Sequence, residues 1–284
     1  MSLFINTNSE ALIAQNNLTS TENSLNGAMT DLSSGLRINT AADDAAGYAI
    51  SEDLTGQVNG LGQATNNAQD ATALIQTADG ALNDVEQMLQ RVRELAVEYQ
   101  GGTLDSTDQN AIVSEVTQLV CQIDQIGQQA QFNGISLFNQ GTGATSSLTF
   151  QVGANTGDQI SITLQTLTGA NGLLSVIDSI GAGASDTSFC LAANSILNTI
   201  DNLIDSVSTL ASTFGAVQNR LSYTMDNLST YSENLSAAQS NIQDVDMASE
   251  MTEFTKDQIL EQSGISMLSQ AEQSPQAVLK LLQS

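Results

Sequence analysis

Residues 50–99 read ISEDLTGQVNGLGQATNNAQDATALIQTADGALNDVEQMLQRVRELAVEY, with apolar residues at alternating intervals of four and three positions. Two rows share one seam, and their members are Leu54, Leu61, Ala68, Ile75, Leu82, Leu89 and Ala96, then Ile50, Ala64, Ala71, Ala78, Val85, Val92 and Tyr99. A repeat of about 3.5 residues keeps both rows on one side of a helix. At about 1.5 Å per residue the segment would extend about 75 Å, far more than a helix of an ordinary globular domain.

A second segment, residues 189–245, repeats the same pattern and is the expected packing partner. Its rows are Phe189, Ile196, Leu203, Leu210, Val217, Thr224, Tyr231, Ala238 and Val245, then Ala193, Ile200, Val207, Phe214, Leu221, Leu228, Leu235 and Ile242. Two glycines after Tyr99 end the first rod, and Ser106 with Gln109 has the spacing of a capping box. The third helix that follows carries Ile112, Val116, Leu119, Ile123 and Ile126. Because the loop is short, we expect this helix to run antiparallel to the first rod.

Residues 132–188 are rich in Gly, Ser and Thr and contain two segments in which every second residue is apolar. These residues are Leu148, Phe150 and Val152, then Ile160, Ile162 and Leu164. The link GANTGD at 153–158 predicts a hairpin turn. The fold class predicted for the chain is therefore mainly α, an elongated antiparallel helical bundle or coiled coil with a small β-hairpin tip at the end of its rods.

Both ends of the chain carry weaker versions of the four-three pattern. The members are Ala11, Ala14, Leu18, Thr21, Leu25, Ala28 and Leu32 at the start, and Leu260, Gly264, Met267, Ala271, Ser274, Val278 and Leu281 at the end. These narrow stripes are flanked by residues with poor helix propensity, so neither arm should be stable alone. Between the first arm and the first rod, residues 37–48 predict a joint, with Thr40 or Asp43 capping the rod. We expect both arms to become ordered on assembly.

The composition excludes several classes of partner. Six basic residues against 31 acidic ones give a formal net charge of -25, which argues against binding to nucleic acids and to anionic membranes. Copies packed together would repel one another, so we expect assembly to strengthen with added salt or near pH 4. An alternative interpretation is that the acidic surface serves solubility alone.

No residue pattern predicts a catalytic, cofactor or metal site. The chain has no histidine, its two cysteines Cys121 and Cys190 are far apart, and no GxSxG or phosphate-binding loop is present. Asp43 and Asp44 are adjacent and fit capping better than acid-base catalysis. The cysteines are interpreted as free thiols, with a disulfide as the alternative. The N-terminus has no signal-peptide pattern and no apolar run could span a bilayer, which alone predicts a cytoplasmic protein without membrane insertion.

Five motifs closely resemble bacterial flagellin, the subunit of the flagellar filament. They are LSSGLRINTAADDAAG at 32–47, LQRVRELAV at 89–97, QFNGISLF at 131–138, NLSAAQSNIQDVDMASEM at 234–251 and MLSQAEQSPQAVLKLL at 267–282. The resemblance covers about residues 1–165 and 190–284. It implies a non-enzymatic, secreted homopolymer of the extracellular flagellum, used for swimming motility and exported unfolded through the type III channel. It therefore replaces the cytoplasmic prediction.

The resemblance also implies a domain organisation. Residues 1–40 with 246–284 would form an inner terminal coiled-coil domain, residues 41–131 with 189–245 a helical rod domain, and residues 132–188 a small β-rich outer tip. The large outer domains of longer flagellins would be absent. The implied partners are further copies of the chain, the flagellar export apparatus and its chaperone, and the filament cap and junction proteins.

Three sets of site residues follow. The expected assembly residues are Leu18, Leu25, Leu32, Leu260, Met267, Ala271, Val278 and Leu281. Gln90, Arg91, Leu95 and Glu115 match positions by which many flagellins are recognised by a vertebrate Toll-like receptor, although filament contact is the primary role expected of them. O-glycans could be attached, as in some relatives, at Ser146, Ser147, Thr166, Thr168, Ser185 and Thr187, with a plain solvated loop as the alternative.

Two other functions are compatible with the same helices. A hook-filament junction protein shares the terminal coils but usually has weaker DDAAG and C-terminal motifs. A secreted helical adhesin would bind a surface through its tip. Seeded polymerisation into long filaments would distinguish a filament subunit from both.

Overall fold

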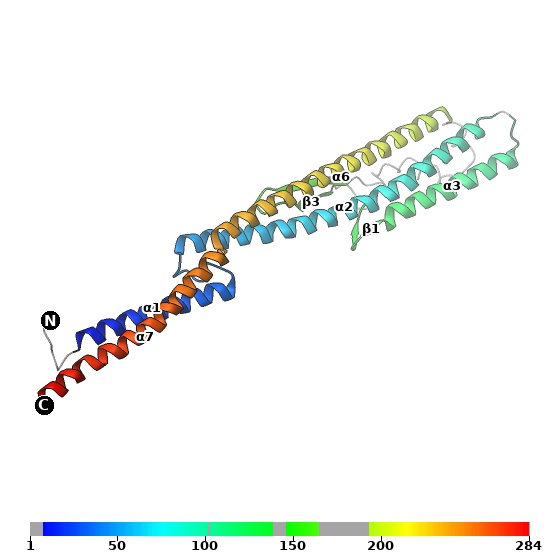
Figure 1. Cartoon of the computed structure of the whole chain (residues 1–284). Helices are drawn as coiled ribbons and strands as arrows, with labels where there is room; N and C mark the ends of the chain where they lie inside the picture. Colours follow the sequence, from blue (N-terminus) through cyan, green and yellow to red (C-terminus); the bar gives the residue numbers. More distant parts are fainter. Residues whose placement is uncertain (1–7, 102, 139–145, 165–192, 284) are drawn as a thin grey trace. The chain divides into compact units, whose positions relative to one another are not determined.

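The computed structural model describes residues 8–101, 103–138, 146–164 and 193–283 (Figure 1). The chain divides into two compact units, one of residues 1–58 with 233–284 and the other of residues 59–232. Two long helices, α2 (Ala45–Tyr99) and α6 (Ala193–Gln243), contribute to both units. The division therefore falls within these helices, while the sequence-based domain limits were set at residues 40 and 246.

The unit of residues 59–232 is a bundle of α2, α6 and α3 (Ser106–Gln129). Arg93 and Thr55 of α2 contact Asp201 and Gln239 of α6, so α6 runs antiparallel to α2. Arg91 of α2 contacts Glu115 of α3 across the short connection, so α3 is antiparallel to α2 as well. The core of this unit contains alanine and aliphatic residues from all three helices. The predicted mainly helical fold is confirmed.

The predicted seam of α2 is buried from Leu61 to Ala96, and Leu74 and Leu95 join it. In α6 the predicted residues Ile200, Leu203, Val207, Leu210, Phe214, Leu221 and Leu228 are buried. The predicted burial is wrong for Ile50 and Tyr231, which are exposed. At the start of α2 the adjacent residue Ser51 is buried in place of Ile50. The helix α6 ends two residues earlier than the predicted rod, and the prediction for Phe189 lies outside the described residues.

The predicted hairpin is present as β3 (Ser146–Gln151) and β4 (Gln159–Leu164), paired antiparallel with Phe150 opposite Ile160. Every second residue of β4, namely Ile160, Ile162 and Leu164, is buried in the same core as the helices. A second, shorter hairpin joins β1 (Gln131–Phe132) to β2 (Ile135–Ser136). Asn133 and Gly134 between these strands have φ angles of 49° and 79°, which suit a two-residue turn.

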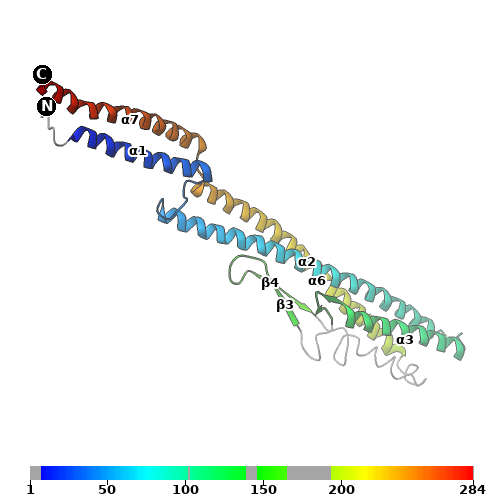
Figure 2. The ribbon, with the colours of Figure 1, turned by 90° about the horizontal axis from the view of Figure 1, so that it is seen from below.

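The β3–β4 hairpin packs along the side of the helices, not at the end of the rods as expected. Ala154, in its turn, lies so close to α2 that a Cβ atom on Gly60 would be 3.2 Å from the Ala154 Cβ. The core residues of β4 explain this position, because alternate apolar side chains gain more by covering the α2–α6 seam than by facing water. Figure 2 shows β3 and β4 beside these helices.

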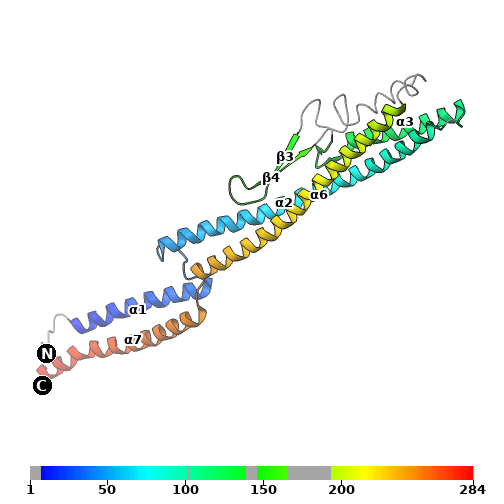
Figure 3. The same ribbon diagram turned by 90° about the horizontal axis from the view of Figure 1, so that it is seen from above.

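The unit that contains both chain ends is built from α1 (Ser9–Ser34) and α7 (Met247–Gln283), together with parts of α2 and α6. Figures 2 and 3 both show α1 and α7 side by side. The predicted joint lies between α1 and α2, where Arg37 N–H donates to the Gln243 carbonyl at 2.7 Å. The Arg37 Nη2 also donates to the Ile242 carbonyl at 2.6 Å, so the joint is fixed to the end of α6.

Two predicted helix caps are displaced by one residue. Asp44, and not Thr40 or Asp43, caps the N-terminus of α2, because its Oδ1 accepts from the backbone N–H groups of Ala46 and Gly47. Asp105, and not Ser106, is the N-cap of α3, because its Oδ1 accepts from the N–H groups of Thr107 and Asp108. In both cases two cap-forming residues are adjacent, and an aspartate accepts the free N–H groups of the first turn.

Candidate assembly surface on the terminal helices

The first helix turns its predicted apolar row toward α7. Ala11, Ala14, Leu18, Thr21, Leu25 and Leu32 are half-buried, and Ala28 is buried. Asn8 begins α1, and its Nδ2 donates to the Ala271 carbonyl of α7 at 2.8 Å. Leu18, ten residues after Asn8 on α1, lies beside Gly264, which is seven residues before Ala271 on α7. The two helices are therefore antiparallel. Among the predicted assembly residues, Leu18 therefore contacts the chain's own last helix, and Leu25 and Leu32 are half-buried on the same row of α1.

The last helix presents a different row to α1 from the one predicted. Its less exposed residues are Glu250, Phe254, Asp257, Glu261, Gly264, Leu268 and Ala271. Gly264 and Ala271 were expected there, but Leu260 and Met267 are exposed and Met267 keeps 63% of its surface accessible. The reason is close approach, because a Cβ on Gly264 would lie 3.2 Å from the Leu18 Cδ1 atom and a larger residue would not fit without movement.

Large apolar side chains on both terminal helices stay exposed in a single copy. These exposed residues are Leu12, Ile13, Met29, Met247, Met251, Ile259, Leu260, Ile265 and Met267. Only Leu260 and Met267 were identified from the sequence, because the other seven lie outside the four-three rows. These seven residues could have been found from the sequence, because they put apolar side chains on a second face of helices that are otherwise polar. An exposed apolar set of this size indicates an interaction surface.

A groove of about 680 Å³ lies between α1 and α7. Ile13 and Leu18 line it from α1, and Leu260, Gly264 and Met267 line it from α7. Leu18 of α1 and Leu260 and Met267 of α7, three of the predicted assembly residues, therefore meet in one concave, mostly apolar surface. Ala271 also lines the groove, whereas the side chains of Val278 and Leu281 lie outside the described part of the chain.

Acidic side chains interrupt the seam nearer the start of α7. Burial raises the pKa of Glu250, and the neighbouring carboxylates of Asp31 and then Glu253 raise it further. Asp257 is only 4% exposed, and its Oδ1 lies 3.9 Å from the Lys256 Nζ. The ionised Glu250 carboxylate opposes close packing of α1 and α7, so the pair is less stable there than an apolar seam would be.

The predicted receptor residues are brought together only in part. Gln90, Arg91 and Glu115 are exposed on α2 and α3, and the Arg91 Nη2 lies 2.9 Å from the Glu115 Oε1. Hydrogen bonds to Glu115 and Glu94 raise the pKa of the Arg91 guanidinium. Leu95, in contrast, is 1% exposed and belongs to the core of the bundle. An intact copy therefore offers three of the four side chains to a partner.

Other predicted features are found at single positions. Cys121 is a free, exposed thiol on α3, and Ser147 is exposed on β3. The side chain of Ser146 and residues Thr166, Thr168, Ser185, Thr187 and Cys190 lie outside the described residues. Within the described ranges, no group of three or more His, Cys, Asp or Glu side chains could hold a metal ion. None of the helices described is both long and apolar enough to cross a lipid bilayer.

The sequence matches known proteins over nearly the whole chain. Residues 5–142 match the bacterial flagellin N-terminal helical region, and residues 197–282 match the bacterial flagellin C-terminal helical region. Flagellin of Halalkalibacterium halodurans is 46% identical over 280 residues, which cover 99% of this chain and 100% of that protein. The flagellar filament 33 kDa core protein of Treponema phagedenis is 42% identical, with coverage of 99% and 100%.

A solved structure shares the fold at low sequence identity. It is a Vibrio parahaemolyticus protein assigned as a flagellar hook-associated protein, with a TM-score of 0.59, 15% identity, and coverage of 71% of this chain and 100% of that one. At this identity the likeness concerns the fold alone. The two family regions and the full-length identity to flagellins show more: this chain belongs to the bacterial flagellin family.

Proposed function

We propose that this chain is the structural subunit of a bacterial flagellar filament and that it polymerises through the α1–α7 pair. The observation that carries the proposal is the set of exposed apolar residues on both terminal helices, together with the groove between them. Family membership supplies the kind of polymer, since relatives aligned over their full length are flagellins or flagellar filament core proteins. The role is structural, and no catalytic step belongs to it.

Burial in a polymer would satisfy what one copy leaves exposed. Complete burial of a Leu, Ile or Met side chain contributes about 1.5–3 kcal/mol, and a half-exposed one has part of this still to gain. Several such side chains lie on each of the two helices. Further copies packed against the pair would therefore stabilise both the polymer and the terminal helices themselves.

The partners and the route to the outside follow from the same role. A filament subunit acts outside the cell, so the chain would be secreted through the flagellar export apparatus with its chaperone, and would meet cap and junction proteins at the ends of the filament. The α1–α7 seam supports passage in an unfolded form, because the Glu250 carboxylate weakens the isolated pair. Receptor recognition, if it occurs on an intact copy, would involve Gln90, Arg91 and Glu115.

A hook-filament junction protein and an adhesin are less well supported. The likeness to the hook-associated protein concerns only the fold, whereas the identity to flagellins extends over the full length of both chains. The exposed apolar residues also gather on the helices at the chain ends, whereas Ile135 is the large exposed apolar residue in the described part of the tip that an adhesin would use.

Seeded polymerisation of the purified full chain tests the proposal. The variant Ile13→Ser with Met267→Ser removes one exposed apolar residue from each helix of the groove. Val97→Ser is the matched control, because Val97 is equally exposed on α2 but does not line the groove. We expect the double variant to stop filament growth in electron micrographs while its circular dichroism stays helical, and the control to grow normally.

Deletion of residues 267–284 should likewise stop growth and leave the rods helical. Unchanged growth of the double variant, or equal losses in the double variant and the control, would show that the terminal helices are not the assembly surface. Wild-type protein that never forms long filaments would contradict the filament function itself.

A further inference from the structure

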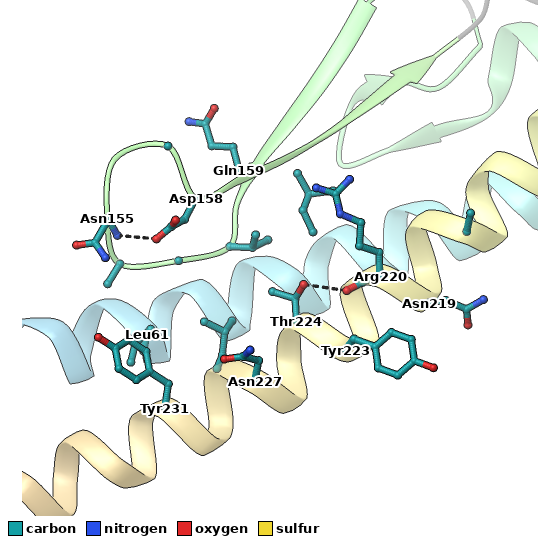
Figure 4. A pocket seen from close by; sticks show the side chains of 17 residues that line it. Leu61, Asn155, Asp158, Gln159, Asn219, Arg220, Tyr223, Thr224, Asn227 and Tyr231 are labelled. Atoms are coloured by element: carbon teal, nitrogen blue, oxygen red, sulfur yellow. Dashed lines mark hydrogen bonds between the residues drawn. The ribbon is translucent and has the colours of Figure 1, made fainter.

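A second groove, of about 710 Å³, lies between the β3–β4 turn and α6. Figure 4 shows Asn155 and Asp158 of the turn on one side and Arg220, Asn227 and Tyr231 of α6 on the other. All residues that line this groove belong to the unit of residues 59–232. It is therefore separate from the groove between the terminal helices.

The turn that forms one wall is held in shape by its own hydrogen bonds. The Gln151 Nε2 donates to the carbonyls of Gly153 and Asn155, both at 2.8 Å. The Val152 N–H donates to the Asp158 carbonyl at 2.9 Å, and Gly157 has a φ of 103°, a conformation that favours glycine. The wall is thus formed before any partner arrives, which lowers the entropic cost of binding.

Arg220 is the chemically unusual residue of the groove. Arg91, Arg93 and Lys256 each pair with a carboxylate, and the Arg37 guanidinium donates to a carbonyl. In the part of the chain that the structure describes, no carboxylate pairs with the Arg220 guanidinium, although the chain has 31 acidic residues. The groove also holds the Asp158 carboxylate, whose Oδ2 accepts from the Asn155 N–H of the turn, so among the residues described Arg220 is its cation without a carboxylate partner on a molecule whose net charge is -25.

Two tyrosines of α6 also line the groove, Tyr223 one helical turn from Arg220 and Tyr231 at the other end of the groove (Figure 4). Tyr223 is 76% exposed and Tyr231 is 43% exposed, and both line the groove. Tyrosine and arginine are the residue types that most often dominate the binding energy of protein interfaces. An exposed cluster of this composition is typical of a protein docking site.

We propose that this groove receives a carboxylate-bearing segment of a second copy of the chain, with Arg220 as its ion-pair partner and the two tyrosines as packing surfaces. The inference rests on the proposed filament function and adds a lateral contact to it. Charge complementarity selects the occupant, because a polymer of this chain surrounds each Arg220 with acidic surfaces. The contact would also offset part of the repulsion between copies.

Elongation from seeds by the full-length protein tests the contact. Arg220→Gln removes a positive charge and Ser229→Glu adds a negative one, so each makes the net charge more negative by one, but Ser229 is exposed on α6 outside the groove. We expect Arg220→Gln to raise the critical concentration for elongation by about tenfold, Arg220→Lys to restore most of the loss, and Ser229→Glu to stay within about twofold of wild type. Thermal unfolding of the monomers checks that the variants fold alike.

A photo-cross-linking amino acid at position 223 identifies the occupant. The expected product is a cross-link between two copies that forms in filaments and not in dilute monomer, and that maps to an acidic segment. The inference fails if Arg220→Gln elongates as wild type does, or if cross-links form only within one copy or to another protein. Failure of wild-type protein to polymerise would instead contradict the filament function.

Discussion

Asn8 connects the first helix to the last through both ends of one amide group. Its Oδ1 accepts from the Ala11 N–H of α1 at 3.2 Å, and its Nδ2 donates to the Ala271 carbonyl of α7 at 2.8 Å. The same side chain therefore caps the N-terminus of α1 and fixes the register of α1 against α7. The two roles can be separated by mutation.

Asn8→Asp keeps the capping oxygen and removes the donor, whereas Asn8→Ala removes both. We expect Asn8→Asp to lose about 1 kcal/mol from the stability of the α1–α7 pair and Asn8→Ala to lose about 2 kcal/mol, since a cap and a hydrogen bond each contribute about 1 kcal/mol. Hydrogen exchange of the α1 amides measures the difference. Equal protection in both variants would show that the Ala271 contact contributes nothing.

Two helical glycines should respond in opposite directions to replacement by alanine. At Gly62 an added Cβ meets nothing within 4 Å, so Gly62→Ala should stabilise α2 by about 1 kcal/mol. At Gly264 the added Cβ would lie 3.2 Å from the Leu18 Cδ1, so the gain in helix propensity is offset by separation of α1 from α7. Urea unfolding should show a gain for Gly62→Ala and none for Gly264→Ala.

Leu95 and Arg91 lie on opposite sides of the boundary between core and surface. Leu95→Ala should cost about 2–5 kcal/mol, because it leaves a cavity in the bundle. Arg91→Ala should leave the unfolding midpoint almost unchanged, since its ion pairs are exposed. Any loss of receptor activity in Leu95→Ala must therefore be compared with its folded fraction, whereas a loss in Arg91→Ala reports on contact directly.

Acidification should first strengthen the α1–α7 pair. Burial, then Asp31 and Glu253, raises the pKa of Glu250 above its ordinary 4.5, so ionised Glu250 weakens the folded pair. This cost is relieved as the pH falls through the raised pKa and is absent below 4.5. Amide protection of α7 should increase over this interval in wild type and much less in Glu250→Gln, with Glu272→Gln as an exposed control on the same helix.

Further acidification should weaken the joint between α1 and α2. The Thr40 N–H, then the Asn39 N–H and the Thr40 hydroxyl, lower the pKa of Asp43 below its ordinary 3.8 against the opposing effect of desolvation. This stabilisation is complete above pH 3.8 and is lost as the pH falls through the lowered pKa. Asn39 and Thr40 amide exchange should accelerate there in wild type. Asp43→Asn should show fast exchange at every pH.

The periodicity of α2 and α6 predicted their buried faces well because a long seam repeats the same requirement many times. From Leu61 to Ala96 each apolar residue of the repeat meets a partner in the same chain. The periodicity predicted the wrong buried residues on α7. Gly264 lies against α1 and Asp257 is buried, while Leu260 and Met267 are exposed. Periodicity identifies an apolar face but does not say whether its partner belongs to the same molecule.

Smaller errors have local causes. The observed N-caps differ from the predicted ones by one residue, because two adjacent residues at each site, Asp43 with Asp44 and Asp105 with Ser106, can both accept the free N–H groups of the first turn. The hairpin at Asn133 and Gly134 had a readable signal, since Asn-Gly between short extended segments favours this turn. The docking groove could not have been predicted, because no pattern in the sequence places the turn at 153–158 opposite Arg220.

Four of the exposed apolar side chains on the terminal helices are methionines: Met29, Met247, Met251 and Met267. Thioether sulfur is readily oxidised to the sulfoxide, which is polar and unsuited to a dry contact. Oxidation by peroxide before assembly would make part of the apolar contact surface polar. In an assembled copy, neighbouring copies would cover these sulfur atoms and protect them. Oxidative damage would then accumulate in the unassembled pool and spare the finished fibre.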